Sequence, residues 1–343
     1  MLAKIKYPGC FLVLATGFCI LFPYLFDLKS INWLNMNQLT MISQNHSKNM
    51  PNVTIQTPVI GRHFICYKCE GRLGNQLFQY ASIYGIAMMN NLSIIAHKSC
   101  VITQYFRVRN LTLAHDANAC SSFKVLSEIM PRVFNKSYFT LPNKVNIFLR
   151  GYLQSWKYFQ NVKDGLLEQL KFVETIETRG RGEINVLKSN YINVTGTNPT
   201  IIGIHVRMGD LFADPQYHQI GMEFAPPGYI HKAMAYYITR YSKILFIVCS
   251  DSILETKVTI DSFNLNVTIH YMEGKRKAIE DLSILAHCEH VIQTVGTFGW
   301  WAAYLSGGTS LYYKFPGRQG SVVEKRYNSY DYFYPEWTGL DSE

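Results

Sequence analysis

IIGIHVRMGD, residues 201–210, starts as a run of mostly apolar residues and ends in ionisable ones. The first six residues predict a strand that is buried on both faces, as in a parallel sheet with helices on each side. Arg207 and Asp210 come just after this strand. Because ligands of doubly wound domains bind beyond the carboxyl ends of the strands, the stretch predicts both an α/β fold and the place of a ligand site.

The residues after this stretch repeat the same alternation. Short apolar runs predict strands, and segments with helical periodicity separate them, which is typical of a parallel sheet covered on both faces. We find no internal repeat and no low-complexity tract. Strands are predicted at 201–206, 244–250, 267–272, 290–294 and 310–314, and helices at 228–241, 252–258, 276–288 and 298–305.

The preceding part of the chain is less regular. Residues 97–195 mix strand and helix patterns, and 178–200 predict a crossing between two halves. A chain of 343 residues exceeds what one core usually serves, so we expect two α/β domains, at 63–199 and 200–343, or one large domain with extensions. In the first half, a strand is predicted at 63–68, a turn at 70–76, a helix at 77–91 and a second strand at 92–96.

Residues 7–26 are 20 consecutive uncharged residues, YPGCFLVLATGFCILFPYLF, preceded by Lys4 and Lys6. This length spans a bilayer. A cleaved signal peptide usually has a shorter apolar run and a small-x-small cleavage site, so we favour an uncleaved transmembrane signal-anchor. The lysines would keep residues 1–6 in the cytoplasm. With this orientation of the anchor, the rest of the chain lies in the secretory lumen. Residues 27–62 are polar and without periodicity, so they predict a stem.

Seven N-glycosylation sequons fit a luminal location. Asn266 belongs to a predicted strand, where burial would prevent modification. The acceptors are Asn45, Asn52, Asn91, Asn110, Asn135, Asn193 and Asn266.

Six cysteines follow the apolar segment, in a compartment where disulfides persist. Cys66 and Cys69 form a Cys-x-x-Cys pair, but no second pair at ligand spacing accompanies it. HCEH at 287–290 matches no common zinc pattern either. We therefore predict disulfides or plain thiols and no metal, with the pairing left open.

The formal net charge of +9 comes without a basic stripe. The longest basic clusters are GKRK at 274–277 and RGR at 179–181, which are too short to indicate a nucleic-acid-binding protein. The positive charge suits a luminal enzyme with an anionic substrate.

Polar residues follow three of the predicted strands at one sheet edge and predict a nucleotide-sized crevice. Arg207 can offer a planar pair of donors to a phosphate, and a helix that starts near Thr297 adds N–H groups at its positive end. The alternative is a structural ion pair between Arg207 and Asp210 across a tight turn. The rim residues are His205, Arg207, Gly209 and Asp210, then Cys249, Ser250 and Asp251, and finally Thr294, Gly296, Thr297 and Phe298.

EGRLGNQ, residues 70–76, has a similar form. Gly71 and Gly74 bracket Arg72, and Asn75 lies where a helix would begin, so main-chain and side-chain donors can contact one ligand. Glycine in such turns also serves packing alone. No Asp-x-Asp sequence occurs in the chain, so a divalent ion on a diphosphate has no obvious ligands.

Four motifs in this order resemble those of the family 11 α-1,2-fucosyltransferases, over residues 63 to about 330. This resemblance implies transfer of L-fucose from GDP-β-L-fucose to the 2-hydroxyl of a terminal galactoside, with inversion. It also implies a GT-B-like pair of Rossmann-like domains, no metal or other cofactor, and a single-pass type II protein of the Golgi membrane. The motifs are GRLGNQLFQYAS (71–82), GIHVRMGD (203–210), ILFIVCSD (244–251) and TVGTFGWWAAYLSGG (294–308).

The resemblance also implies roles for individual residues. Arg207 is similar to the arginine that binds the β-phosphate and stabilises the departing GDP, and Asp210 is our first candidate for the catalytic base, ahead of Asp214 and Glu223. The positions that resemble donor-binding residues are Arg72, Gly74, Asn75, His205, Arg207, Ser250, Asp251, Thr297 and Phe298.

One residue departs from the family pattern. Met208 stands where the family usually has a second arginine, in HVRRGD. If strand alternation persists, residues 207 and 208 point to opposite faces, so only one need serve the phosphate.

Two alternatives stay open: a fucosyltransferase with another acceptor or linkage, and an inactive membrane-tethered glycan-binding protein of the same fold.

Overall fold

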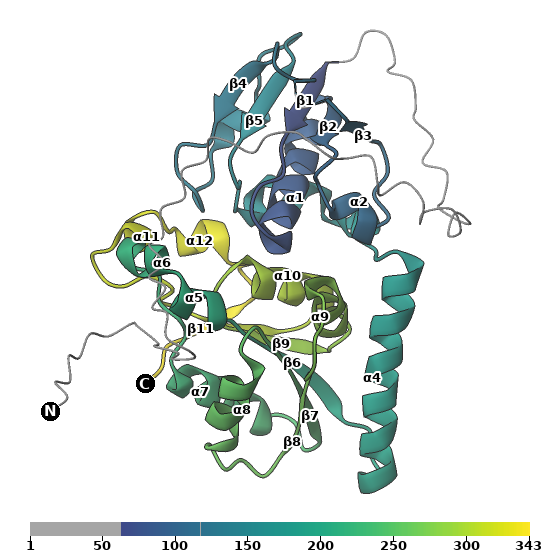
Figure 1. Cartoon of the computed structure of the whole chain (residues 1–343), viewed down its shortest axis with the longest axis vertical. Helices are drawn as coiled ribbons and strands as arrows, with labels where there is room; N and C mark the ends of the chain where they lie inside the picture. Colours follow the sequence, from purple (N-terminus) through teal and green to yellow (C-terminus); the bar gives the residue numbers. More distant parts are fainter. Residues whose placement is uncertain (1–62, 117) are drawn as a thin grey trace, which may run out of the picture. The chain divides into compact units, whose positions relative to one another are not determined.

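The structure is a computed structural model that describes residues 63–116 and 118–343 (Figure 1). The predicted cytoplasmic tail, signal-anchor and stem, at residues 1–62, lie outside the described part. Within that part, no helix combines the length and the apolar character needed to cross a membrane.

The first half of the described chain builds a five-stranded parallel sheet. Its strand order is β3-β2-β1-β5-β4, so β2 and β3 lie on one side of β1, and β4 and β5 lie on the other. Only the first two strands were predicted at their positions. The strands are β1 (Phe64–Tyr67), β2 (Ser93–His97), β3 (Leu111–Ala114), β4 (Lys124–Ser127) and β5 (Ile147–Arg150).

The second half builds a six-stranded parallel sheet. Its order is β11-β10-β9-β6-β7-β8, which is the order of a doubly wound dinucleotide-binding domain. The predicted α/β class and the five predicted strands of this half are confirmed, and β11 is an addition. The strands are β6 (Thr200–Val206), β7 (Ile244–Ser250), β8 (Thr268–Tyr271), β9 (His290–Gln293), β10 (Ser310–Tyr313) and β11 (Thr338–Leu340).

Helices connect the strands in both halves, and every helix predicted from periodicity is present. Three short 3-10 helices, η1 (Lys136–Phe139), η2 (Trp156–Tyr158) and η3 (Gln160–Val162), lie in the first half. The α-helices are α1 (Leu73–Asn90), α2 (Ile102–Tyr105), α3 (Lys163–Gln169), α4 (Glu174–Thr195), α5 (Gly209–Ala213), α6 (Pro215–Ile220), α7 (Pro227–Ile238), α8 (Ile253–Asp261), α9 (Ala278–Ala286), α10 (Thr297–Ser306), α11 (Val322–Lys325) and α12 (Ser329–Tyr332).

Helix α4 makes up most of the segment predicted only as a crossing. It is 22 residues long although it contains Gly180 and Gly182, which lower helix propensity. Tertiary contacts explain why this segment forms a long helix despite its two glycines. Gly180 is buried, and a Cβ atom there would lie 2.0 Å from the Ser283 hydroxyl, so this glycine lets α4 approach α9 closely.

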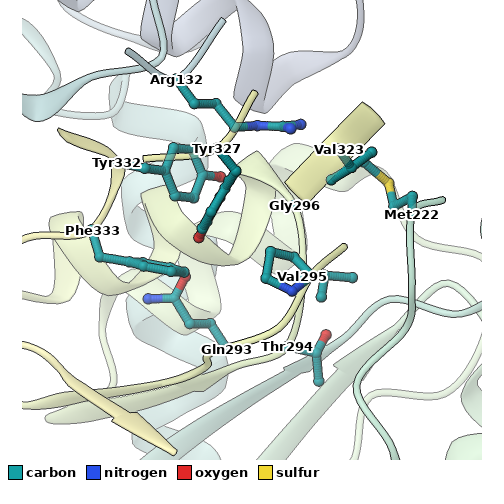
Figure 2. A pocket seen from close by; sticks show the side chains of 11 residues that line it. Arg132, Met222, Gln293, Thr294, Val295, Gly296, Val323, Tyr327, Tyr332 and Phe333 are labelled. Carbon is teal, nitrogen blue, oxygen red and sulfur yellow. The ribbon is translucent and has the colours of Figure 1, made fainter. Parts of the chain in front are cut away.

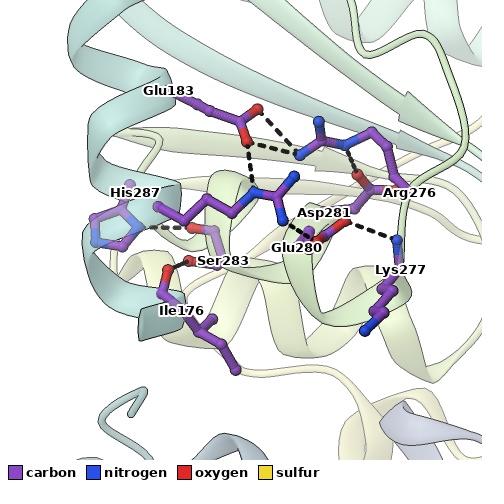
Figure 3. Close-up of polar contacts among 9 residues, drawn as sticks. Ile176, Glu183, Arg276, Lys277, Glu280, Asp281, Ser283 and His287 are labelled. Atoms are coloured by element: carbon purple, nitrogen blue, oxygen red, sulfur yellow. Dashed lines mark hydrogen bonds and ion pairs between the residues drawn. The ribbon is translucent and has the colours of Figure 1, made fainter. Parts of the chain in front are cut away.

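Ion pairs reinforce the contact between α4 and α9 (Figure 3). Arg276 lies 3.1 Å from Glu183 of α4 and 2.6 Å from Asp281 of α9, with its side chain only 14% exposed. Arg179 of α4 pairs with Glu280 of α9. Burial raises the pKa of Asp281, and its bond with Arg276 opposes that rise. A partly buried network of this kind fixes the orientation of the long helix more than it adds net stability.

Aromatic packing joins α1 to α10. The Phe78 ring of α1 lies 4.5 Å from Trp300 and 5.2 Å from Trp301, between ring centroids. Tyr332 of α12 stacks on the same Phe78, and its carbonyl accepts a hydrogen bond from the Trp300 indole at 2.8 Å. The C-terminal segment therefore packs against elements of both halves. The boundaries at 63–199 and 200–343 stay predictions.

The cysteines of the described part form two disulfides and two buried thiols. Cys66 pairs with Cys120, and Cys69 with Cys100. The Cys-x-x-Cys pair is thus divided between two disulfides. The predicted use of disulfides or thiols is confirmed, and the buried thiols are Cys249 and Cys288.

The sequon asparagines of the described part are mostly accessible. Asn135 is half-buried, with its side chain accepting a bond from the Ser137 amide at 3.0 Å. The expectation that Asn266 lies buried in a strand is wrong, because it is exposed and precedes β8. Asn45 and Asn52 lie outside the described residues, and occupancy stays a prediction for all seven. The exposed sites are Asn91, Asn110, Asn193 and Asn266.

Candidate functional site

The site starts where the two central strands of the second sheet end. Thr294, just after β9, is buried, and its hydroxyl accepts the Arg207 N–H at 3.0 Å and donates to the His205 carbonyl at 3.2 Å. This hydroxyl ties the ends of β6 and β9 together at the point where the strand order reverses. The backbone of Arg207 is therefore fixed at the sheet edge where doubly wound folds bind ligands.

The Arg207 guanidinium lies against the first residue of the turn into α10. Gly296 has φ +96°, and a Cβ atom there would lie only 2.6 Å from Arg207 Nη1. The guanidinium also lies over the Tyr217 ring, 5.2 Å from its centroid. Gly296 has no side chain to cap α10, so the first N–H groups of this helix stay available to an anion at its positive end.

The N-terminus of α1 meets that of α10. A Cβ atom on Gly74 would lie 2.6 Å from the Thr297 hydroxyl and 2.7 Å from the Phe298 amide nitrogen. The Thr297 hydroxyl donates to Asn75 Oδ1 at 2.9 Å, and the Gln154 amide donates to the same oxygen at 3.0 Å. Two positive helix ends thus lie side by side, which favours a negatively charged ligand.

His205 and Phe298 pack together at the first turn of α10. His205 is buried in β6, and its ring lies 4.9 Å from that of Phe298. A Cβ atom on Gly299 would lie 2.8 Å from His205 Nδ1, so the imidazole is packed against the first turn of α10. The structure therefore brings together His205, Arg207, Thr297 and Phe298 with Gly74 and Asn75.

Asp251 holds the loop that carries Arg207. Its Oδ1 accepts the N–H groups of Met208 at 2.8 Å and Gly209 at 3.1 Å. Ser250 shares a hydrogen bond of 2.8 Å with the Thr256 hydroxyl of α8. A direct contact of Ser250 or Asp251 with a nucleotide stays a prediction.

Met208 contacts a different element from Arg207, although β6 ends at Val206 and the strand does not continue through these two residues. Its sulfur accepts a bond from the Thr256 hydroxyl at 3.7 Å, and its side chain packs among the apolar residues of the second half. Its place in the structure is therefore one of packing.

The three carboxylates considered as a base differ in their surroundings. Asp210 lies in α5, and its side chain is outside the described part of the chain. Asp214 caps α6 by accepting the Gln216 N–H at 2.9 Å. Glu223 lies 3.9 Å from Arg318. The roles of all three in catalysis stay predictions, as does the donor contact of Arg72.

A small pocket beside Gly296 contains residues that sequence reasoning missed (Figure 2). Arg132 comes from the first half, and Tyr327 and Tyr332 come from the C-terminal segment. Burial raises the pKa of Tyr332 to about 12, while the charges of Arg132 and Arg207 oppose this rise. Arg132 lies in the loop after β4, a strand that the sequence did not predict, so no pattern at a sheet edge marks it.

The residues that the structure describes contain no cluster of three or more His, Cys, Asp or Glu side chains that could hold a metal. His287, of the HCEH segment, bonds instead with the Ser283 carbonyl at 2.6 Å and Glu177 at 3.2 Å. His290 contacts the Tyr241 hydroxyl at 2.7 Å. Both histidines are thus engaged in structural contacts.

Comparison with known proteins gives a consistent match. Residues 36–341 match the family model described as Glycosyl transferase family 11. The chain is 30% identical over 278 residues to galactoside 2-alpha-L-fucosyltransferase SEC1 of Bos taurus, covering 79% of this chain and 72% of the relative. It is 29% identical over 276 residues to galactoside alpha-(1,2)-fucosyltransferase 2 of Gorilla gorilla gorilla, covering 80% and 78%.

Solved structures with a similar arrangement are more distant. POFUT1 in complex with GDP-fucose has a TM-score of 0.47 and 10% identity, covering 76% of this chain and 99% of that one. Fucosyltransferase NodZ from Bradyrhizobium has a TM-score of 0.43 and 16% identity, covering 70% and 92%.

Proposed function

The chain belongs to glycosyl transferase family 11, and from this premise we propose that it is a galactoside α-1,2-fucosyltransferase. The donor is GDP-β-L-fucose and the acceptor is the 2-hydroxyl of a terminal galactoside on a glycoprotein or glycolipid. The names of its relatives support this specificity. The observation that carries the proposal is Arg207 beside the paired N-termini of α1 and α10.

Breaking the fucosyl–phosphate bond leaves negative charge on GDP and positive charge on the sugar ring. The Arg207 guanidinium and the N–H groups at the start of α10 stabilise the departing diphosphate, because they are held in place before the reaction. Each such donor contributes about 3 kcal/mol to transition-state stabilisation. We propose that these groups replace a metal ion.

Transfer with inversion requires the acceptor hydroxyl to attack the face of the sugar opposite GDP and to lose its proton. A carboxylate within hydrogen-bond reach is the usual acceptor of that proton. We keep Asp210 in this role. The two parallel sheets support the proposed GT-B-like fold.

The chemistry of the surface and of the cysteines supports our proposal for the compartment. Two disulfides and four exposed sequons suit an oxidising, glycosylating compartment. We propose a Golgi membrane protein of single-pass type II, anchored by residues 7–26 with its catalytic part in the lumen.

The alternative of an inactive glycan-binding protein rested on Met208. The contact of that side chain with Thr256 gives Met208 a packing role and so favours the active enzyme.

The test is a transfer assay with the purified full-length chain, GDP-fucose and a panel of glycans, with and without EDTA. We expect fucose on a terminal galactose, released by an α-1,2-specific fucosidase, at a rate that EDTA does not change. Glycan binding without turnover would indicate the inactive protein. Resistance of the product to that fucosidase would indicate another linkage, and loss of activity in EDTA would contradict the metal-independent diphosphate site.

A further inference from the structure

The pocket beside Gly296 contains an arginine from the first half of the chain. Arg132 lies in the loop between β4 and η1, and its Nε donates to Gln154 Oε1 at 3.1 Å. Its guanidinium lies 5.9 Å from the ring centroids of both Tyr327 and Tyr332. Figure 2 shows Arg132 on the side of the pocket opposite Thr294, with the two tyrosines beside Arg132.

Arg132 and Arg207 converge on the same two residues. Gly296 lines the pocket with Arg132 and also lies against the Arg207 guanidinium. Tyr332 lies under Arg132, and both arginines bear on its ionisation. The two arginines, one from each half of the chain, therefore have a glycine and a tyrosine as common neighbours.

Arg132 forms no ion pair with a carboxylate among the residues that the structure describes. Its contacts among the described residues are one bond to a neutral amide and two aromatic faces. Glu128 is the nearby carboxylate: burial raises its pKa, and the charge of Arg132 opposes that rise. Its Oε2 accepts the N–H groups of Tyr152 and Leu153, at 2.8 and 3.2 Å, and not those of Arg132. A cation without an ion-paired carboxylate, linked through Gln154 and Asn75 to Thr297 at the start of α10, is typical of an anion-binding site.

The loop holds Arg132 in a set position. Its φ of +61° is sterically disfavoured for a residue with a Cβ atom and persists only when the surrounding structure enforces it. Asp331 of α12 does so by accepting the Phe134 N–H at 2.9 Å, and the Tyr158 hydroxyl accepts the Asn135 N–H at 2.9 Å. The guanidinium is thus placed before any ligand arrives.

We propose that Arg132 is a second diphosphate-binding residue, which contacts the β-phosphate of the nucleotide sugar from the side opposite Arg207. This assignment rests on the proposed GDP-fucose donor. It makes donor binding dependent on both halves of the chain, with the C-terminal segment holding the Arg132 loop in place.

Calorimetric titration of the full-length chain with GDP and GMP tests the assignment. We expect Arg132→Gln to weaken GDP about 10- to 100-fold, the loss of a charge-assisted hydrogen bond, while GMP binding changes by less than about 3-fold. Arg132→Lys should retain part of the affinity. Arg109→Gln is the matched control, since Arg109 is an exposed arginine of the same half.

The outcomes separate this assignment from the proposed function. Unchanged GDP affinity in Arg132→Gln, with fucose transfer by the wild type, would overturn the assignment alone. Equal weakening of GDP and GMP would show that Arg132 only positions Gln154. A wild-type chain that does not bind GDP would overturn both proposals.

A second measurement applies even if the variant fails to fold. The wild-type chain is treated with phenylglyoxal with and without saturating GDP, and modified arginines are identified by peptide mass spectrometry. We expect GDP to protect Arg132 and to leave Arg109 reactive. Equal modification of Arg132 in both samples would contradict the assignment.

Discussion

Individual glycines decide how closely the parts of the site approach each other. Gly74 allows the start of α1 to touch Thr297, and Gly296 allows the Arg207 guanidinium to lie on the main chain. The sequence motifs identified both loops, because glycine and arginine that follow a predicted strand can be recognised from the sequence. The atoms that a side chain at each glycine would collide with could not be predicted, because they belong to residues more than eighty positions away.

The first prediction compares the two ends of α10. Gly296→Ala should lose roughly 1–3 kcal/mol of stability, because its backbone conformation is nearly restricted to glycine. Gly307→Ala, with φ +73° and no atom within 4 Å of a new Cβ, should lose roughly 1 kcal/mol. Only Gly296→Ala displaces Arg207, so only it should lower kcat/KM by more than about 10-fold. Thermal unfolding and initial rates measured well below Tm check both, and equal activity of the two variants would contradict the placement of Arg207.

The second prediction concerns Met208. Because its side chain packs against Thr256, Met208→Leu nearly conserves volume and should keep the KM for GDP-fucose within a factor of about 3. Met208→Arg should bring no gain in donor affinity and should lower Tm, since it forces a charge into this packing. If Met208→Arg instead lowered the donor KM, the methionine would have to face the diphosphate.

At the level of elements, α4 shows that tertiary contacts outweigh local preference. Its two glycines have opposite surroundings: Gly180 lies under Ser283, whereas a Cβ on Gly182 would meet nothing within 4 Å. The ion pairs of Arg276 with Glu183 and Asp281 also depend on α9, which is remote in sequence. The sequence of this segment alone therefore predicted only a connection between the two halves and not the helix α4.

The third prediction uses this pair of glycines. Gly182→Ala should stabilise the protein by about 0.5–1 kcal/mol, because alanine is the better helix former and the site is exposed. Gly180→Ala should destabilise it by about 1–3 kcal/mol, because the new methyl group overpacks the contact with Ser283. Urea unfolding of the two variants measures the difference. A similar effect of both substitutions would mean that α4 is not packed on α9 at this point.

At the scale of the whole molecule, the alternation after residue 200 was predictable because each strand and helix there has its own periodic pattern. Other features depend on partners that are far away in the sequence. β11 joins the sheet only because β10 offers an edge, and α12 is held by Lys157, which lies 2.6 Å from Asp331. The Arg132 loop depends on the same Asp331, so the second guanidinium of the site could not be found from a motif.

The fourth prediction concerns the disulfides, whose pairing the sequence left open. Each crosslinks the first half, so Cys66→Ser/Cys120→Ser and Cys69→Ser/Cys100→Ser should each cost about 2–4 kcal/mol of unfolding free energy. Cys69 lies just before the loop that carries Arg72 and leads into α1. The Cys69 and Cys100 pair should therefore also raise the KM for GDP-fucose, and the other pair should not. Steady-state kinetics of the two variants at matched folded fractions decides this, and a KM effect from the other pair alone would contradict it.

The most direct measurement for the account is a structure of the full-length chain with GDP bound, at a resolution that places the phosphate oxygens. We predict the β-phosphate about 3 Å from the Arg207 guanidinium and from the first N–H groups of α10. A structure in which GDP binds elsewhere, with Arg207 held only by protein carboxylates, would contradict the central claim.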